Sequence, residues 1–146
     1  MNNTTNENEK KEETTAQKLA RLQETRARRE KGRDDQRLER EVRKLELAEE
    51  FESKLGAEGS EFFIYDSGHL DDPLFVVKRG LLIQYTKYED SKQTHADRFD
   101  FVSPSVVHPT LDEYKVAREK RIGIEVELAN RLAKLYGLNV KVDSGK

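Results

Sequence analysis

The sequence predicts an α+β protein, in which a long charged N-terminal helical arm precedes a small antiparallel β-hairpin or sheet packed against two or three helices. Three observations support this fold class. Charged and polar residues dominate the first third of the chain, while apolar residues gather in residues 55–142. Residues 62–65 and 74–77 are short runs rich in aromatic and β-branched side chains, which are typical of strands. Apolar residues then recur at helical spacing after Thr110.

Four parts are expected along the chain. Residues 1–14 contain no large apolar side chain after Met1, so nothing offsets the entropy lost on ordering them, and we expect a disordered polar tail. Residues 15–55 are the charged helical arm, and residues 56–142 are the small α+β domain. Residues 143–146 are expected to be a disordered C-terminus.

Charge is segregated along the arm. The formal net charge is only −2, which argues against a globally basic nucleic-acid-binding protein. Residues 18–44 nevertheless hold eleven Lys or Arg against six Asp or Glu, whereas residues 45–61 hold six acids and one Lys. Adjacent blocks of opposite sign favour pairing along one helix or head-to-tail contact between subunits.

The middle of the arm is polar on every side, because residues 23–37 contain Ala27 as their only apolar side chain. Such a helix has no face to bury, so it reaches through solvent, binds a partner or stays partly unfolded. Gly32 costs about 1 kcal/mol relative to Ala in a helix interior, which predicts fraying at this point. Gly56 stands where a left-handed C-cap glycine is expected to end the arm.

An apolar stripe returns after Gly32 at spacings of three and four, and its members are Leu38, Val42, Leu45, Ala48, Phe51 and Leu55. A stripe of this kind needs a surface to cover. The predicted partner-binding residues are therefore Leu38, Val42, Leu45, Phe51 and Leu55. Among them, Phe51 is the predicted anchor between the arm and the domain or a partner.

The domain is expected to begin with an antiparallel hairpin of residues 62–65 and 74–77. Residues 81–88 predict a short helix with Leu81, Leu82, Tyr85 and Tyr88 on one face, or else a third strand. Residues 91–97 predict a loop or a frayed helix end. Residues 99–109 predict a linker with apolar anchors that is broken by two prolines.

Two helices are expected at the end of the domain. Thr110 is the predicted N-cap of the first, with Glu113 completing a capping box, and its predicted inner face is Leu111, Tyr114 and Ala117. A break near residues 121–123 precedes a second helix with the stripe Ile124, Leu128, Leu132 and Leu135. Gly137 is the predicted C-cap, and residues 138–142 predict a short edge strand or a packed extension.

No motif with catalytic chemistry is found in the sequence, which contains no GxSxG, HExxH or glycine-rich phosphate-binding pattern. The absence of Cys excludes disulfides and thiolate zinc sites. A metal site at His69, Asp71 and Asp72 is conceivable, but these residue types are also common in turns. We therefore expect no enzymatic activity, no metal and no cofactor. The chain also lacks an apolar run long enough to cross a membrane, so we expect a soluble, cytoplasmic protein.

The possible phosphate-binding residues are Arg26, Arg28, Arg29 and Arg33. Clustered arginines can neutralise phosphates and release counterions, so an alternative function is a nucleic-acid-associated protein that binds through the Arg-rich helix of residues 26–43. Nearby acids dilute this cluster, and no aromatic side chain is interleaved for stacking on bases. A solvated helix with internal salt bridges is the favoured interpretation.

Residues 54–138 also carry a wider pattern of apolar, Pro and Gly positions. Leu55-Gly56 precedes a strand, residues 73–80 lead into a short helix, residues 106–109 open a helix that carries Tyr114, and residues 128–132 lead to Leu135-Tyr136-Gly137. This pattern resembles small tailed-bacteriophage morphogenesis proteins of the tail assembly chaperone type. The chain departs from it at Gly80 and Gly123, where such proteins tend to have proline.

The resemblance implies a small α+β protein without catalysis, acting as a bacteriophage virion-assembly or tail-assembly accessory protein. Its implied partners are other phage structural or tail proteins, and it is expected in the host cytoplasm or on the virion. A homo-oligomer is a further expected association, nucleic acid is not favoured, and no membrane association is expected. The resemblance does not extend to the helical arm.

Overall fold

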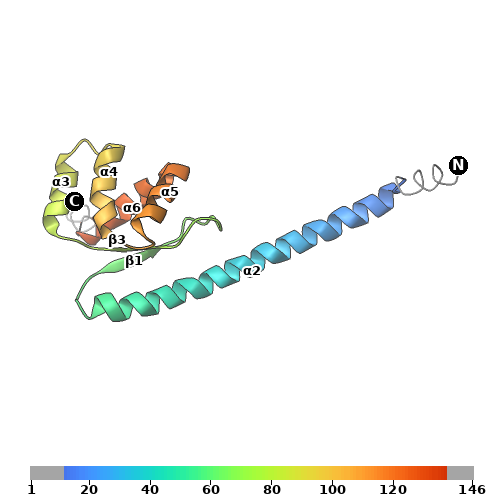
Figure 1. Cartoon of the computed structure of the whole chain (residues 1–146), viewed down its shortest axis with the longest axis horizontal. Helices are drawn as coiled ribbons and strands as arrows, with labels where there is room; N and C mark the ends of the chain where they lie inside the picture. Colours follow the sequence, from blue (N-terminus) through green and yellow to red (C-terminus); the bar gives the residue numbers. More distant parts are fainter. Residues whose placement is uncertain (1–11, 138–146) are drawn as a thin grey trace, which may run out of the picture. The chain divides into compact units, whose positions relative to one another are not determined.

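The computed structural model describes residues 12–137 and confirms the α+β class. Its elements, labelled in Figure 1 where there is room, are α2 (Thr15–Gly56), β1 (Phe62–Tyr65), β2 (Phe75–Lys78), α3 (Leu82–Asp90), α4 (His95–Val102), the 3-10 helix η1 (Ser103–Ser105), β3 (Val106–His108), α5 (Leu111–Lys120) and α6 (Ile122–Leu135). The chain divides into two compact units between Arg40 and Glu41, inside α2. The segment predicted as the arm, residues 15–55, therefore contributes to both units. The expectations for residues 1–11 and 138–146 lie outside the described residues.

Helix α2 begins with a capping box that the sequence analysis did not recognise. Thr14 Oγ1 accepts a hydrogen bond from Gln17 N at 3.1 Å, and Gln17 Oε1 accepts one from Thr14 N at 3.0 Å. The two side chains thus satisfy backbone donors that have no partner within the helix. The helix then runs through Gly32 without the expected break.

Helix α2 does not end in the left-handed glycine cap predicted at Gly56. Gly56 is the last residue of the helix, and the left-handed conformation falls instead on Gly59, at φ 71°. The amides of Glu58 and Ser60 both donate to the Leu55 carbonyl, at 3.1 and 2.9 Å. These bonds satisfy a terminal carbonyl of the helix, which is the role that had been assigned to a cap at Gly56.

The second unit contains a three-stranded antiparallel sheet in the order β1-β2-β3. The predicted hairpin is confirmed, with Phe62 opposite Lys78 and Tyr65 opposite Phe75. The third strand was not predicted, because Val106–His108 lies in the segment assigned to a proline-broken linker. A strand of three residues is too short for a periodic signal, and prolines are compatible with the ends of an edge strand.

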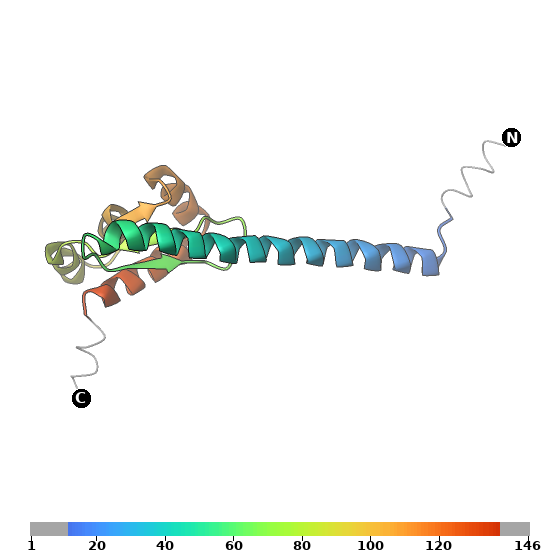
Figure 2. The ribbon, with the colours of Figure 1, turned by 90° about the horizontal axis from the view of Figure 1, so that it is seen from below.

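Each face of this sheet is covered by helices. Alternate side chains on β2 point to opposite faces, so Phe75 and Val77 belong to one apolar cluster and Val76 belongs to the other. Helices α3 to α6 cover the first face, and Leu47, Phe51 and Leu55 of α2 cover the second. Figure 1 shows these two layers on opposite sides of the strands, and Figure 2 shows the last turns of α2 passing over β1.

Helix α4 covers residues 95–102, where the sequence predicts the end of a loop and the beginning of a linker. A capping box opens it, in which Thr94 Oγ1 accepts from Asp97 N and Asp97 Oδ2 accepts from Thr94 N. Its C-terminal residues Phe101 and Val102 are buried in the first cluster. Asp in place of the more usual Glu or Gln weakened this start signal in the sequence.

The other helices agree with their predictions in part. Helix α3 forms as expected, but only Tyr85 and Tyr88 of its predicted face are buried, while Leu81 and Leu82 are exposed. Thr110 caps α5 by accepting from Glu113 N at 3.3 Å, while Glu113 Oε1 accepts from the Thr110 hydroxyl at 3.0 Å. The predicted inner residue Leu111 is exposed. The break before α6 and the left-handed Gly137 are confirmed.

We predict that Phe51→Ala lowers the free energy of unfolding by about 3 kcal/mol, because the substitution leaves a cavity between α2 and the sheet. Urea denaturation followed by circular dichroism measures the change. The control Val116→Ala, at an exposed position of α5, should change stability by less than about 0.5 kcal/mol. Equal effects of the two substitutions would contradict the assigned role of Phe51.

Candidate functional site

Asp71 and Asp72, two of the residues conceivable as metal ligands, connect the β1–β2 loop to the junction of α5 and α6. Lys120 Nζ donates to Asp71, and Arg121 Nε donates to Asp72 Oδ2 at 2.8 Å. The hydrogen bond from Lys120 is the main cause that lowers the pKa of Asp71 to about 2. Within residues 12–137, no three or more His, Asp or Glu side chains are arranged to hold a metal ion.

A buried ion pair joins α5 to α6. Glu125 is fully buried and accepts hydrogen bonds from Tyr114 Oη at 3.1 Å and from Arg118 Nη2 at 3.0 Å. The hydrogen bond to Glu125 raises the pKa of Arg118, and burial raises the pKa of Tyr114. The Arg118 guanidinium also lies over the Phe99 ring, 4.6 Å from its centroid. The carboxylate is therefore held by charged and polar partners of this chain, which suits a role in positioning the helices.

The three histidines lie on different elements. His69 is in the β1–β2 loop, His95 begins α4, and His108 ends β3. His108 lies beside Phe51, with the two ring centroids 6.3 Å apart, and burial lowers the pKa of its imidazole. This contact brings β3 and α2 together on the second face of the sheet.

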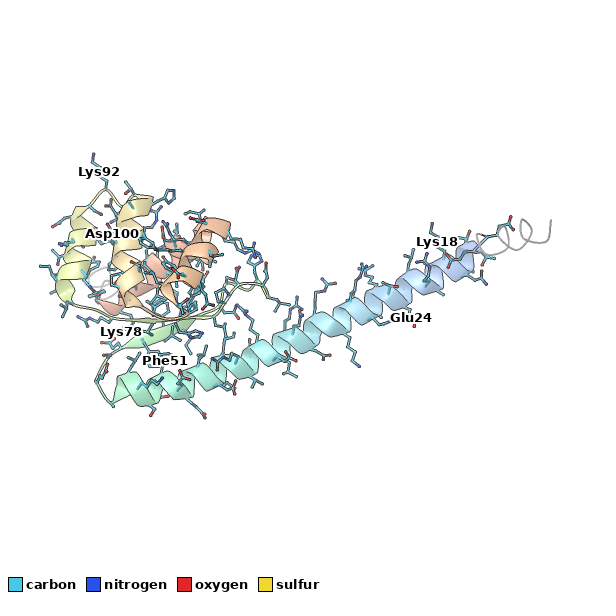
Figure 3. The ribbon with its side chains drawn as sticks, in the orientation of Figure 1. Lys18, Glu24, Phe51, Lys78, Lys92 and Asp100 are labelled. Atoms are coloured by element: carbon cyan, nitrogen blue, oxygen red, sulfur yellow. The ribbon has the colours of Figure 1, made fainter. Side chains whose placement is uncertain are left out.

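The predicted partner-binding residues divide into two groups. Phe51 and Leu55 are only 8% and 6% exposed because they pack against the sheet, and Figure 3 shows Phe51 pointing from α2 toward it. Leu38, Val42 and Leu45 are 66%, 51% and 69% exposed. The sequence stripe also omitted Leu47, which is fully buried beside Phe51. Val42 and Leu45 are thus the members of the stripe in the second unit that remain available to a partner.

A second exposed apolar group lies at the start of α3, and two of its residues, Leu81 and Leu82, belong to the helix face predicted from the sequence. Leu81, Leu82 and Ile83 are 71%, 60% and 62% exposed. The backbone before them is fixed, because Gly80 N donates to Tyr136 Oη at 2.9 Å and Tyr136 stacks on Tyr85 with 5.2 Å between ring centroids. Large exposed apolar patches are typical of interaction sites, so this group is a candidate surface for a partner. Its signal in the sequence was three consecutive large aliphatic residues at a helix start.

The possible phosphate-binding residues lie on the α2 segment of the first unit. Arg26 pairs with Glu30 at 3.3 Å, and Arg28 pairs with Glu24 at 3.1 Å. Arg29 and Arg33 are exposed on the same segment. The structure therefore shows a surface of mixed charge, in which two of the four arginines are already paired within the helix.

Comparison of the chain with family models, curated proteins and solved structures finds no match. The resemblance to tail assembly chaperones therefore rests on the residue pattern alone. Among the helices of residues 12–137, none has the length and apolar character needed to cross a membrane.

We predict that His108 contributes a loss of stability as the pH falls. Because its pKa is lowered in the folded state, the unfolded chain takes up the proton more readily below the ordinary pKa of 6.5. The free energy of unfolding should decrease between about pH 7.5 and pH 5.5, and His108→Gln should reduce that decrease. Urea titrations at the two pH values measure it, with the wild-type chain as the reference that shows the full decrease. An unchanged decrease in His108→Gln would refute the assignment.

We predict that Arg118→Met costs about 3 kcal/mol of stability, because Glu125 is left buried without its cation. The double variant Arg118→Met with Glu125→Met should recover part of this loss, since neither charge remains buried. Chemical denaturation provides the measurement. Arg43→Met, which removes a surface pair with Glu46, is the control and should change stability by less than about 0.5 kcal/mol. A double variant no more stable than Arg118→Met would count against this account.

Proposed function

We propose that the protein is a non-enzymatic bacteriophage virion-assembly or tail-assembly accessory protein that acts through protein–protein contacts. The observation that carries the proposal is the exposed aliphatic group Leu81, Leu82 and Ile83. Burying one such side chain contributes roughly 1.5–3 kcal/mol. A partner that covers all three therefore gains a favourable contribution to binding, which offsets part of the cost of association.

The geometry around α3 supports a preformed binding surface. Tyr136 holds Gly80 through its hydroxyl, and the Arg79 guanidinium lies over the Tyr136 ring, 5.0 Å from the centroid. The buried residues Tyr85 and Tyr88 fix the other side of the helix in the core. Because the helix is fixed in this way, little conformational entropy is lost when its exposed side chains bind.

The partners we propose are other structural or tail proteins of a phage, met in the host cytoplasm or on the virion. The support for this class of partner is the resemblance of the residue pattern to tail assembly chaperones, and that pattern includes residues 73–80 immediately before the exposed group. The ion-paired carboxylates Asp71 and Glu125 serve to join elements of the fold, and this is consistent with a protein that works by contact.

Nucleic-acid binding through residues 26–43 is the alternative. The positive excess of this region supports it, but the pairing of Arg26 and Arg28 with neighbouring glutamates reduces the charge offered to phosphates. A salt-dependent gel shift that disappears in Arg29→Glu with Arg33→Glu would favour this alternative over the proposed function.

We predict that Leu82→Asp with Ile83→Asp abolishes co-purification of the tagged chain with virion structural proteins from infected cells, because the charges prevent burial of the patch. The partners are identified by mass spectrometry, and circular dichroism should show an unchanged fold, since both side chains are exposed. Val116→Asp with Ile122→Asp, two exposed apolar positions on α5 and α6, is the matched control and should retain the partners. Retention of the same virion proteins by the Leu82 and Ile83 variant would overturn the proposal.

A further inference from the structure

We infer that the solvent-facing side of α2 in the second unit binds the basic α2 segment of a second copy of this chain. The receiving surface, here called the α2 strip, consists of Val42, Leu45, Glu49 and Glu52. The segment that binds it consists of residues 28–38 of the other copy. The inference concerns self-association and goes beyond the proposed function.

The packing of α2 on its own sheet orients the strip. Leu47 and Phe51 are buried against the sheet, and at 3.6 residues per turn Leu45 lies about 160° around the helix from Leu47. All four strip residues are exposed. Their spacing of three, four and three is that of one coiled-coil seam, with two apolar positions followed by two acidic ones.

The chemistry of the strip specifies what can cover it. Residues 45–61 hold six acids and one Lys, and this Lys54 is already paired with Glu50 at 3.5 Å. A partner for the strip therefore needs cations opposite Glu49 and Glu52 and an apolar side chain opposite Val42. An exposed helix that meets all three requirements is the fitting occupant.

The first unit of the same chain carries such a helix. Counted from Leu38 toward the N-terminus in steps of three, four and three residues, one face of the helix carries Asp35, Lys31 and Arg28. Antiparallel pairing places Leu38 against Val42, Lys31 against Glu49, and Arg28 against Glu52. Leu38 is exposed, and the present partner of Arg28 is a solvent-exposed Glu24. Asp35 is the one mismatch, since it falls beside Leu45.

These features favour a second copy over an unrelated partner. Each copy carries both the strip and the segment, so a pair of copies offers two such contacts, whereas an unrelated partner would have to supply a matching helix of its own. Exposed charges separated by more than a Debye length are screened by salt, and even close surface pairs weaken at high ionic strength. The association should therefore be strongest at low salt.

Sedimentation velocity of the purified full-length chain tests the inference at two salt concentrations. Screening of surface charges is weak at about 50 mM salt and strong at about 500 mM salt. We expect the wild type at low salt to show twice the chain mass of 17.0 kDa, and the mass to fall toward 17.0 kDa at high salt. Arg28→Glu with Lys31→Glu should be monomeric at both salts, and so should Glu49→Lys with Glu52→Lys. Lys87→Glu with Lys92→Glu reverses two exposed charges on and after α3 and should leave the dimer intact.

Mixing the two charge-reversed variants provides the decisive measurement. In a mixed pair, the acidic segment of one variant faces the basic strip of the other, and the two unchanged surfaces also carry opposite charges. An equimolar mixture should therefore recover the dimer mass at low salt. Recovery also shows that both variants are folded. A wild type that stays monomeric at low salt, or a mixture that stays monomeric, would overturn the inference. Neither outcome bears on co-purification through Leu82 and Ile83, because the measurement uses the purified chain alone.

Discussion

The second unit depends on the contact between α2 and the sheet. Three short strands have two apolar faces, and a sheet this small is not stable unless both are covered. Helices α3 to α6 bury the face that carries Phe75 and Val77, and α2 buries the face that carries Val76. The last turns of α2 are therefore part of the core, and their position determines which side of the helix is left for other contacts.

Ion pairs connect elements of the second unit in addition to its apolar packing. The Arg118–Glu125 pair joins α5 to α6, and Asp71 and Asp72 bring the β1–β2 loop to the same junction through Lys120 and Arg121. A buried ion pair contributes little net stability, whereas the loss of one partner is costly. We interpret these contacts as devices that select one arrangement of the two helices among several that would bury similar apolar area.

Local patterns predicted most of the elements, but which side chains are exposed depends on how those elements pack. The long helix, the hairpin, the Thr110 cap and the break before α6 all follow from signals within a few residues. The stripe from Leu38 to Leu55 was wrong as a single face, since three successive steps of three residues carry it about 180° around the helix between Val42 and Phe51. Strand β3 and the Arg118–Glu125 pair could not be predicted, because the first is too short for periodicity and the second depends on how two helices pack.

The polar segment of α2 is suited to binding because its internal contacts are weak. Pairs such as Arg26–Glu30 and Arg28–Glu24 contribute about 0.2–0.5 kcal/mol each to an exposed helix. Exchanging one of them for a contact with another chain therefore costs little, while burying a single exposed aliphatic side chain contributes roughly 1.5–3 kcal/mol. The few exposed aliphatic residues therefore add to the affinity of any such contact. The charges around them then determine which partner fits and in which direction it lies.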